Sequence, residues 1–155
     1  MLSQKARYAL HALFVLAERG PSAPVQIADI AAHARVPRKF LEQILLDLKR
    51  RGILHSVRGK HGGYVLGRPA EAIALADIIR AIDGPLALSP CVSRMAYRKC
   101  DDCFDEATCA LRKVLLDVRD ATSDILESRN LAGMVKQSSA RSGRNPPRRP
   151  RRRAA

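Results

Sequence analysis

The segment from residue 26 to residue 66 limits the possible folds more than any other part of the chain. Apolar residues at helical spacing predict a short helix over residues 26–33. After a short connection, Pro37 opens a second helix that extends to about Arg51, because a proline at the first helical position loses no hydrogen bond. Gly52 is expected to end this helix in a left-handed conformation. A short helix, a tight turn and a second helix with basic residues at its start form the helix-turn-helix pattern.

Two short strands follow this pattern directly. Residues 53–57 and 64–66 are mostly apolar, and the residues between them are glycine-rich and basic. This arrangement predicts a β-hairpin with a basic tip, which is the wing of a winged helix-turn-helix. Helices are also predicted over residues 3–19 and 75–82. The expected fold class is therefore mainly α, with a small β-hairpin wing and a DNA-binding domain over residues 1–84.

Three further segments follow this domain. Residues 85–109 contain every cysteine and little regular apolar pattern, so we expect a metal or redox loop there. Over residues 110–134 apolar side chains recur at steps of four and three, which predicts a long dimerisation helix, although such a stripe also suits packing on its own chain. Residues 135–155 are rich in Ser, Gly, Pro and Arg and are expected to be a disordered tail. The heptad-like seam consists of Leu111, Leu115, Val118, Thr122 and Ile125.

The distribution of charge separates the tail from the rest of the chain. The formal net charge is +13, from 28 basic and 15 acidic residues. Eight of the basic residues and no acidic residue lie between Lys136 and the end of the chain, which leaves a modestly basic body. A basic body suits a protein that reads DNA, and an Arg-rich tail by itself indicates only that anions are attracted.

The chain carries four cysteines, and they lie close together in the sequence. No segment is long and apolar enough to span a bilayer, and the N-terminal pattern indicates an amphipathic helix, not a signal peptide. We therefore expect a cytoplasmic protein without membrane contact, in which clustered thiols indicate metal or redox chemistry. Thiolates suit iron–sulfur clusters, zinc or copper(I), and spacing alone does not separate a zinc site from a cluster. The four are Cys91, Cys100, Cys103 and Cys109.

Catalysis is not expected. The sequence shows no set of nucleophile, base and acid, no phosphate-binding loop and no dinucleotide fingerprint. Its four histidines show no metal-site spacing to one another. The sequence therefore predicts a regulator and not an enzyme.

The chain resembles the Rrf2 family of transcriptional regulators over roughly residues 1–133. The resemblance lies in the opening run from Lys5 to Leu10, in Phe40–Ile44 with Leu48, in the wing from Ser56 to Tyr64 and in the cysteine loop. It implies a homodimer that reads a double-stranded DNA operator with the second helix of each motif and with the wing. Family members include regulators with an iron–sulfur cluster, a nitric-oxide sensor and a repressor of cysteine metabolism.

Candidate DNA contacts lie at two places. In helix-turn-helix proteins the first residues of the second helix meet base edges, and by resemblance Lys39, Phe40 and Glu42 fall where family members touch bases. The best single candidate on the wing is Arg58, because arginine favours narrow minor grooves. The full set predicted at the helix start is Arg38, Lys39, Phe40, Glu42 and Gln43. Lys60 and His61 are predicted phosphate contacts at the wing.

The resemblance also implies a cluster, [2Fe–2S] or [4Fe–4S], held by three cysteines, and the match is clearest for Cys91, Cys103 and Cys109. The fourth ligand departs from the family. Some relatives have a histidine where this chain has Arg112, and others use an acidic residue near the partner's N-terminus. Cys100 either completes a four-cysteine site or stays a free reactive thiol. We therefore predict a repressor governed by a cluster or by redox state. The alternative is a metal-free or zinc-containing repressor under the control of thiol oxidation, a metabolite or a protein partner.

Overall fold

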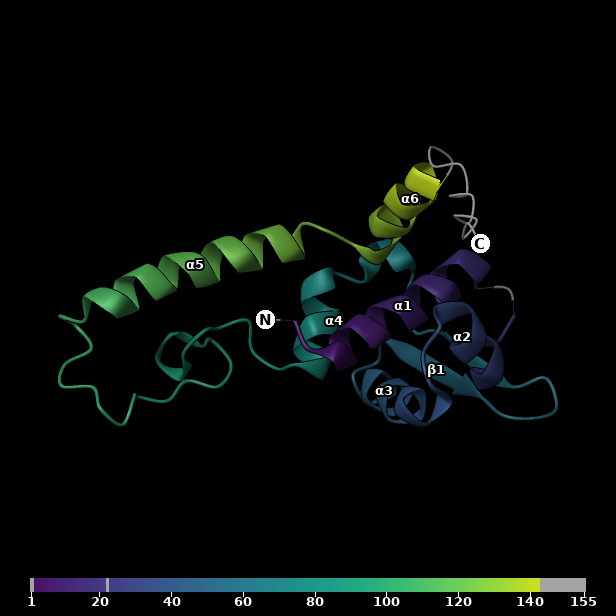
Figure 1. The fold of residues 1–155 in the computed structure, drawn as a ribbon, viewed down its shortest axis with the longest axis horizontal. Coiled ribbons are helices and arrows are strands. Elements are labelled where there is room, and N and C mark those ends of the chain that lie inside the picture. Colours follow the sequence, from purple (N-terminus) through teal and green to yellow (C-terminus); the bar gives the residue numbers. More distant parts are fainter. Residues whose placement is uncertain (1, 22, 143–155) are drawn as a thin grey trace, which may run out of the picture.

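The computed structural model describes residues 2–21 and 23–142 (Figure 1). The helices are α1 (Gln4–Arg19), α2 (Ile27–Ala34), α3 (Arg38–Arg50), α4 (Leu75–Ile82), α5 (Ala110–Glu127) and α6 (Leu131–Ser142), with single 3-10 turns η1 (Ala70–Ala72) and η2 (Pro90–Val92). The strands are β1 (Leu54–Val57) and β2 (Gly63–Leu66). A compact part contains α1 to α4, the hairpin and α6, whereas α5 extends outward beside the cysteine loop (Figure 1).

The predicted winged helix-turn-helix is confirmed. Helix α3 begins directly after Pro37, and Gly52 follows its end with a φ of 68°, the left-handed conformation expected of a helix stop. Between α2 and α3 the chain turns at Arg35, whose φ of 54° is unusual for a residue with a side chain. Helix α1 contacts α2, α3 and α4, so the motif is held against one central helix.

The core of the compact part is aliphatic. Helix α3 buries one stripe at helical spacing, and strand β1 begins with a fully buried leucine. Burial of such side chains contributes roughly 1.5–3 kcal/mol each, which fixes α3 against the body of the domain. The largest fully buried side chains are Leu13, Leu16, Ile30, Leu41, Ile44, Leu45, Leu48, Ile53, Leu54, Ile73, Ile78 and Leu131.

The wing is a regular antiparallel hairpin. Leu54 pairs with Leu66 and Val57 with Gly63, and a backbone bridge from Val25 to Tyr64 fixes the hairpin to the segment before α2. Gly63 lies so close to the Val25 carbonyl that a side chain at this position has no room. The wing is therefore held at its base by backbone contacts, and its tip extends away from the domain (Figure 1).

The helix predicted over residues 110–134 is wrong in its extent, because α5 ends at Glu127 and α6 begins at Leu131. Between them the backbone returns to the compact part, where the N–H of Leu75 donates to Arg129 and the N–H of Leu131 donates to Ile73. The Asn130 side chain accepts from the backbone N–H of Gly133 at 2.9 Å and caps α6. Burial of Leu131 in the core supplies the driving force for this return.

The prediction that the chain is disordered from residue 135 is also wrong in part. Residues 135–142 continue α6, which contacts α1 and η1. A helix already started by the Asn130 cap extends by one hydrogen bond per residue, so a polar sequence can continue it. The remaining tail, residues 143–155, lies outside the described residues. Within the part of the chain that the structure describes, no helix has the length and apolar character needed to cross a membrane.

Candidate functional site

The predicted recognition helix α3 has one buried and one exposed face. Its buried stripe packs on the core, and all five predicted DNA contacts at its start are exposed. Lys39, Gln43, Leu46 and Arg50 follow one another at three- and four-residue steps on the face opposite the buried stripe. Arg50 was not among the predicted contacts. Its helical spacing from Lys39 and Gln43 is the sequence signal that places it on this face.

Asp47 organises the side chains between α1 and α3. Its carboxylate accepts from the Lys5 ammonium at 2.6 Å and from the Gln43 amide at 3.0 Å, and Arg50 lies 3.4 Å away. The hydrogen bond from Lys5 is the main reason that the pKa of Asp47 lies below its usual range, with further lowering by Gln43 and Arg50. Gln43 is thereby held in one orientation with one amide N–H and its carbonyl oxygen free, the pair of groups that recognises adenine.

Two further residues at the start of α3 have neighbours of their own. Phe40 is 61% exposed, and its ring lies 6.5 Å from the ring of Tyr8 on α1. An exposed aromatic side chain at this position suits contact with a thymine methyl group. The Arg38 Nε lies 3.4 Å from Glu42, a pair between exposed side chains that DNA can replace at small cost.

The wing presents three exposed basic residues. Arg58, Lys60 and His61 make no hydrogen bond or ion pair with any described residue, so their donors are available to a ligand. Gly59 has a φ of 111°, a conformation that favours glycine at this turn. A side chain at Gly62 would collide with the Val57 carbonyl, so the tip stays narrow. The wing and the exposed face of α3 thus form two separate sets of free donors in one domain.

The cysteine loop brings the four thiols into one region, and none forms a disulfide. Cys91 is buried in η2, and its sulfur lies 3.4 Å from the Ser89 hydroxyl, which is also 3.5 Å from the sulfur of Cys100. The N–H of Cys103 donates to the carbonyl of Cys100 and closes the turn between them. Cys109 caps α5 by accepting from a backbone N–H of its first turn. Three backbone features, the η2 turn, the turn from Cys100 to Cys103 and the cap of α5, therefore hold the thiols.

The surroundings of Cys103 disfavour its thiolate. Burial raises the pKa of Cys103, and the neighbouring Cys109, Cys100 and Glu106 raise it further, while Lys99 opposes them. Cys100 and Cys109 therefore lie close enough to act on Cys103 electrostatically. A bound cation would release the proton and relieve the repulsion between thiolates.

A hydrogen-bonded pair spans the loop that carries the middle thiols. The Tyr97 hydroxyl donates to the Glu106 carboxylate, whose oxygens lie 2.8 and 2.7 Å away. This bond raises the pKa of Tyr97 above its usual range, with smaller contributions from burial and from the carboxylate charge. Tyr97 and Glu106 thus join the two sides of the segment that contains Cys100 and Cys103.

Arg112 lies in the first turn of α5, close to Cys109 in the chain. The Arg112 backbone N–H donates to the Cys109 sulfur at 3.4 Å, and its side-chain Nε is buried without a hydrogen-bond partner among the described residues. A buried donor without a partner is costly, by about 1–3 kcal/mol or more when it is charged. In the described residues no three His, Cys, Asp or Glu side chains are arranged to hold a metal ion. The thiol donor set and the free Arg112 donor nevertheless fit an anionic sulfur cluster in chemical type.

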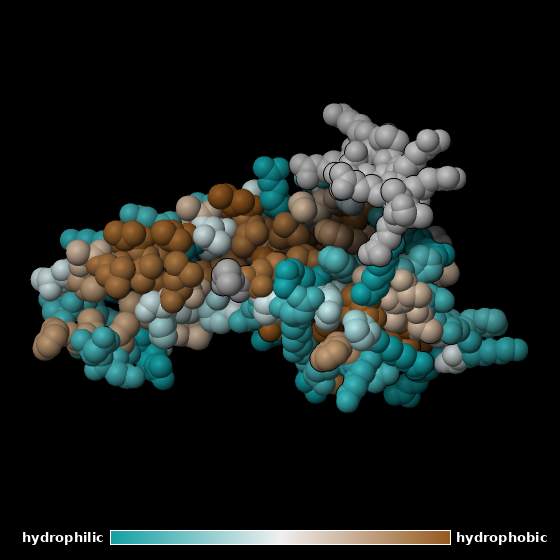
Figure 2. Space-filling view, viewed as in Figure 1, coloured by the Kyte–Doolittle hydropathy of each residue, from teal (hydrophilic) through white to brown (hydrophobic). Residues whose placement is uncertain are grey.

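Helix α5 leaves most of its apolar face uncovered. Leu111, Val114, Val118 and Ile125 are each at least 40% exposed, and Ser123 is the buried residue of this helix. These side chains form a hydrophobic band along the outer part of the molecule (Figure 2). Leu111, Val118 and Ile125 repeat every seven residues, as in a helix that pairs with another helix.

Comparison with known proteins places residues 2–137 among regulators. A family model named Rrf2, described as "Iron-dependent Transcriptional regulator", matches residues 2–137. An Rrf2-like HTH-type transcriptional regulator of Rhodobacter capsulatus is 42% identical over 138 residues, which cover 87% of this chain and 92% of the relative. The structure of CymR, the global cysteine regulator of B. subtilis, is similar with a TM-score of 0.72 and 31% identity, covering 88% of this chain and 97% of CymR. IscR of T. potens gives a TM-score of 0.69 and 29% identity, covering 89% and 88%.

Proposed function

The chain belongs to the Rrf2 family and is a DNA-binding transcriptional regulator, not an enzyme, and from this premise we propose that it is a homodimeric repressor controlled by its cysteine loop. The controlling group is an iron–sulfur cluster. Cys91, Cys103 and Cys109 hold it, and Cys100 supplies the fourth thiolate. When bound, the cluster supplies redox sensitivity that the protein side chains alone provide less readily.

The observation that carries this proposal is the gathering of four free thiols in one loop, with an unpartnered Arg112 donor at the start of the helix that Cys109 caps. A cluster with thiolate ligands is anionic, and hydrogen bonds to its sulfur atoms stabilise it. The buried Nε of Arg112 has no other acceptor among the described residues. The Ser89 hydroxyl, within 3.5 Å of both Cys91 and Cys100, supports their assignment to one site.

Dimer formation is assigned to α5. Its exposed seven-residue repeat fits the same face of a second copy, and burial of this face removes apolar side chains from water. A two-fold dimer presents two α3 helices and two wings to half-sites about one turn of DNA apart. The exposed set of Lys39, Gln43 and Arg50 then faces the major groove, and Arg58 reaches the minor groove or the adjacent phosphates.

Control of DNA binding follows from contacts between the loop and α5. The Arg119 guanidinium on α5 donates to the carbonyl of Val92 at 2.8 Å. Val92 is the residue that follows Cys91 in the chain. Arg80 of α4 pairs with Glu127 near the end of α5 at 2.5 Å. Rearrangement of the loop therefore changes how α5 sits on the winged domain. Because half-site spacing is fixed by the DNA, this shift in population changes operator affinity.

The decisive experiment is anaerobic purification, with iron, acid-labile sulfide and zinc measured per chain beside a visible absorption spectrum. We expect iron and sulfide in comparable amounts and a broad charge-transfer band. DNA fragments selected from a random pool should then bind with an affinity that changes when the loop is oxidised. Full iron loading in Cys100→Ala would reject Cys100 as the fourth ligand, and protein without iron and sulfide would reject the cluster.

A second candidate is control by thiol oxidation without a metal. It is favoured by the Cys91 and Cys100 sulfurs, which share the Ser89 hydroxyl and are therefore near neighbours. The structural likeness to a global cysteine regulator supports the same alternative. Metal-free protein whose DNA binding changes reversibly with a thiol oxidant, and loses this response in Cys91→Ser, would establish it. Zinc alone would point instead to a structural site.

A further inference from the structure

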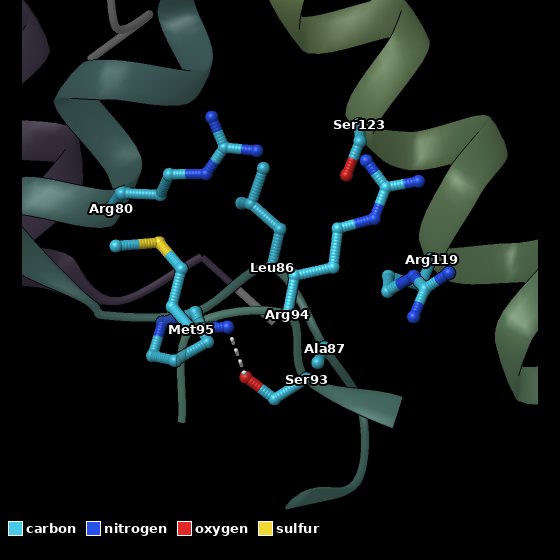
Figure 3. Close-up of a pocket in the computed structure, with 9 residues that line it drawn as sticks. Arg80, Leu86, Ala87, Ser93, Arg94, Met95, Arg119 and Ser123 are labelled. Atoms are coloured by element: carbon cyan, nitrogen blue, oxygen red, sulfur yellow. Dashed lines mark hydrogen bonds between the residues drawn. The ribbon is translucent and has the colours of Figure 1, made fainter. Parts of the chain in front are cut away.

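A small hollow lies where the winged domain, the loop after it and α5 meet (Figure 3). The space inside it is only about 20 Å³, and it opens to solvent. Arg80 comes from α4, Arg94 from the loop, and Arg119 and Ser123 from α5. None of these residues belongs to the cysteine set or to the DNA-binding face. Arg119 and Arg80 join α5 to the loop and to α4, but the hollow itself has no role in the proposed function.

The charge of the hollow is positive. Each nitrogen of the Arg119 guanidinium donates one hydrogen bond, two of them to Asp120, at 2.8 and 2.9 Å, and one to the Val92 carbonyl. Arg94 and Arg80 are engaged less completely. Each guanidinium donates one hydrogen bond to a carboxylate, Arg94 to Asp120 at 2.7 Å and Arg80 to Glu127 at 2.5 Å. Three cations thus face two carboxylates, and both Arg80 and Arg94 keep further N–H groups free.

Ser123 provides an independent sign of a ligand. The residue is 2% exposed, yet its hydroxyl has no hydrogen-bond partner among the described residues. Figure 3 shows this hydroxyl directed into the hollow beside the Arg94 guanidinium, with the Arg80 guanidinium on the opposite side. By contrast, Ser93 accepts from the backbone N–H groups of Met95 and Ala96 and has a structural role. Because the hollow opens to solvent, this hydroxyl keeps its donor and its acceptor available to water or to a ligand that enters there.

We propose that this hollow binds a small oxyanion, either an inorganic one such as sulfate or the carboxylate of a small organic acid. The free N–H groups of Arg80 and Arg94 and the hydroxyl of Ser123 donate to its oxygens. Guanidinium groups match carboxylate and tetrahedral oxyanions through paired hydrogen bonds, and the hydroxyl supplies a third donor. The hollow is too small to enclose a large cofactor, and an anion would lie at its open mouth.

An anion in this position would join three segments. Arg80 belongs to the winged domain, Arg94 lies three residues after Cys91, and Ser123 belongs to the proposed dimerisation helix. A bound anion would hold α5 in one position on the winged domain. It would therefore act on DNA affinity from a site that touches neither DNA nor the thiols, through a preference for one arrangement of these segments.

The test is calorimetric titration of the full-length protein at low ionic strength, with sodium sulfate in one series and sodium acetate in the other. We expect saturable binding of one anion per chain, and the tighter series identifies the source of the oxyanion. Ser123→Ala and Arg94→Gln should each weaken binding at least tenfold, about 1.4 kcal/mol. The matched controls are Arg98→Gln, an exposed arginine of the same loop, and Ser138→Ala, an exposed serine of α6. Both should bind as the wild type does.

Three results would overturn the proposal. The first is absence of saturable binding of either anion. The second is equal affinity in wild type, Ser123→Ala and Arg94→Gln, which would show that the anion binds elsewhere, for example to the basic tail that all variants share. The third is an equal loss in the control variants. If Arg94→Gln fails to fold, Arg80→Gln replaces it, and the same comparison decides the matter. Metal content plays no part in these outcomes, so they are independent of the cluster proposal.

Discussion

The winged domain and the arm formed by α5 and the cysteine loop differ in how their apolar and polar groups find partners. Helix α1 buries six of its 16 residues, whereas α5, with 18 residues, buries Ser123 alone. The arm also carries the free Arg112 donor, the free Ser123 hydroxyl and the apolar band seen in Figure 2. The winged domain is therefore complete as a folded unit. The arm has several groups without partners among the described residues.

The largest expected effect is on the free energy of unfolding, which a truncated leucine should reduce in the winged domain but not in the arm. Leu45→Ala removes a fully buried core side chain of α3 and should reduce the free energy of unfolding by about 2–5 kcal/mol. Leu111→Ala, an equivalent truncation on the exposed face of α5, should leave the unfolding of the winged domain nearly unchanged and weaken dimer formation. Urea unfolding and light scattering measure the two effects. A large loss of domain stability in Leu111→Ala would contradict the division into a complete domain and an incomplete arm.

The second prediction compares two arginines, one on the wing and one in the arm, in their effect on DNA affinity. Arg58→Ala removes one of the unpartnered cations of the wing and should weaken specific DNA binding by about 1–3 kcal/mol. Arg98→Ala removes the same charge from the arm and should change affinity little. Fluorescence anisotropy on a selected DNA site at fixed salt gives both values. Equal losses would mean that net charge, and not the wing, accounts for the effect.

The third prediction tests the unpaired donor in the arm. In Arg112→Gln the cluster loses a nearby positive charge and a hydrogen-bond donor, which should disfavour the more negative reduced state. We expect a tenfold change in the reduction equilibrium, a potential lower by about 59 mV for a one-electron couple. A redox titration measures it, and Lys113→Gln removes the neighbouring exposed charge as a control. Equal shifts in both variants would reject a specific role for Arg112, whereas wild-type protein without a cluster would reject the proposed function itself.

The smallest effect lies within the winged domain and depends on pH. The pKa of Asp47 is lowered in the folded state, chiefly by Lys5, so its ionised form contributes stability above its unfolded pKa of about 3.9. This contribution disappears as the pH falls through the lowered folded value. Asp47→Asn should therefore reduce stability by up to about 1 kcal/mol at pH 7 and by less at pH 3. Urea unfolding at both pH values checks this, with Glu18→Gln, an exposed carboxylate without an ion pair among the described residues, as the control.

Much of the winged domain was predictable because its signals are local. Pro37 and Gly52 mark the ends of α3 within one or two residues, and the glycines of the wing fix the turn between two short strands. The exposed positions of Lys39 and Arg58 follow from the same local patterns. The Asp47 network was not predictable, because Lys5 and Asp47 are far apart in the chain and meet only when α1 packs on α3.

The arm was predicted less well, because its main features depend on contacts between residues that are far apart in the chain. A helical period continues from Ala110 past residue 127, and only the return of Asn130 and Leu131 to the core breaks it. Arg80, Arg94 and Ser123 carry no shared motif, and their convergence depends on how α4, the loop and α5 pack.

The sequence by itself determined the helix-turn-helix, the wing and the clustering of thiols in one loop, because each depends on residues that are neighbours in the chain. Tertiary structure alone decided that α6 closes the winged domain, that Arg112 has a buried donor without a partner, and that two arginines and a serine face one hollow. Such features depend on burial and on contacts between distant segments, and the free energy of those contacts is not encoded in any local pattern.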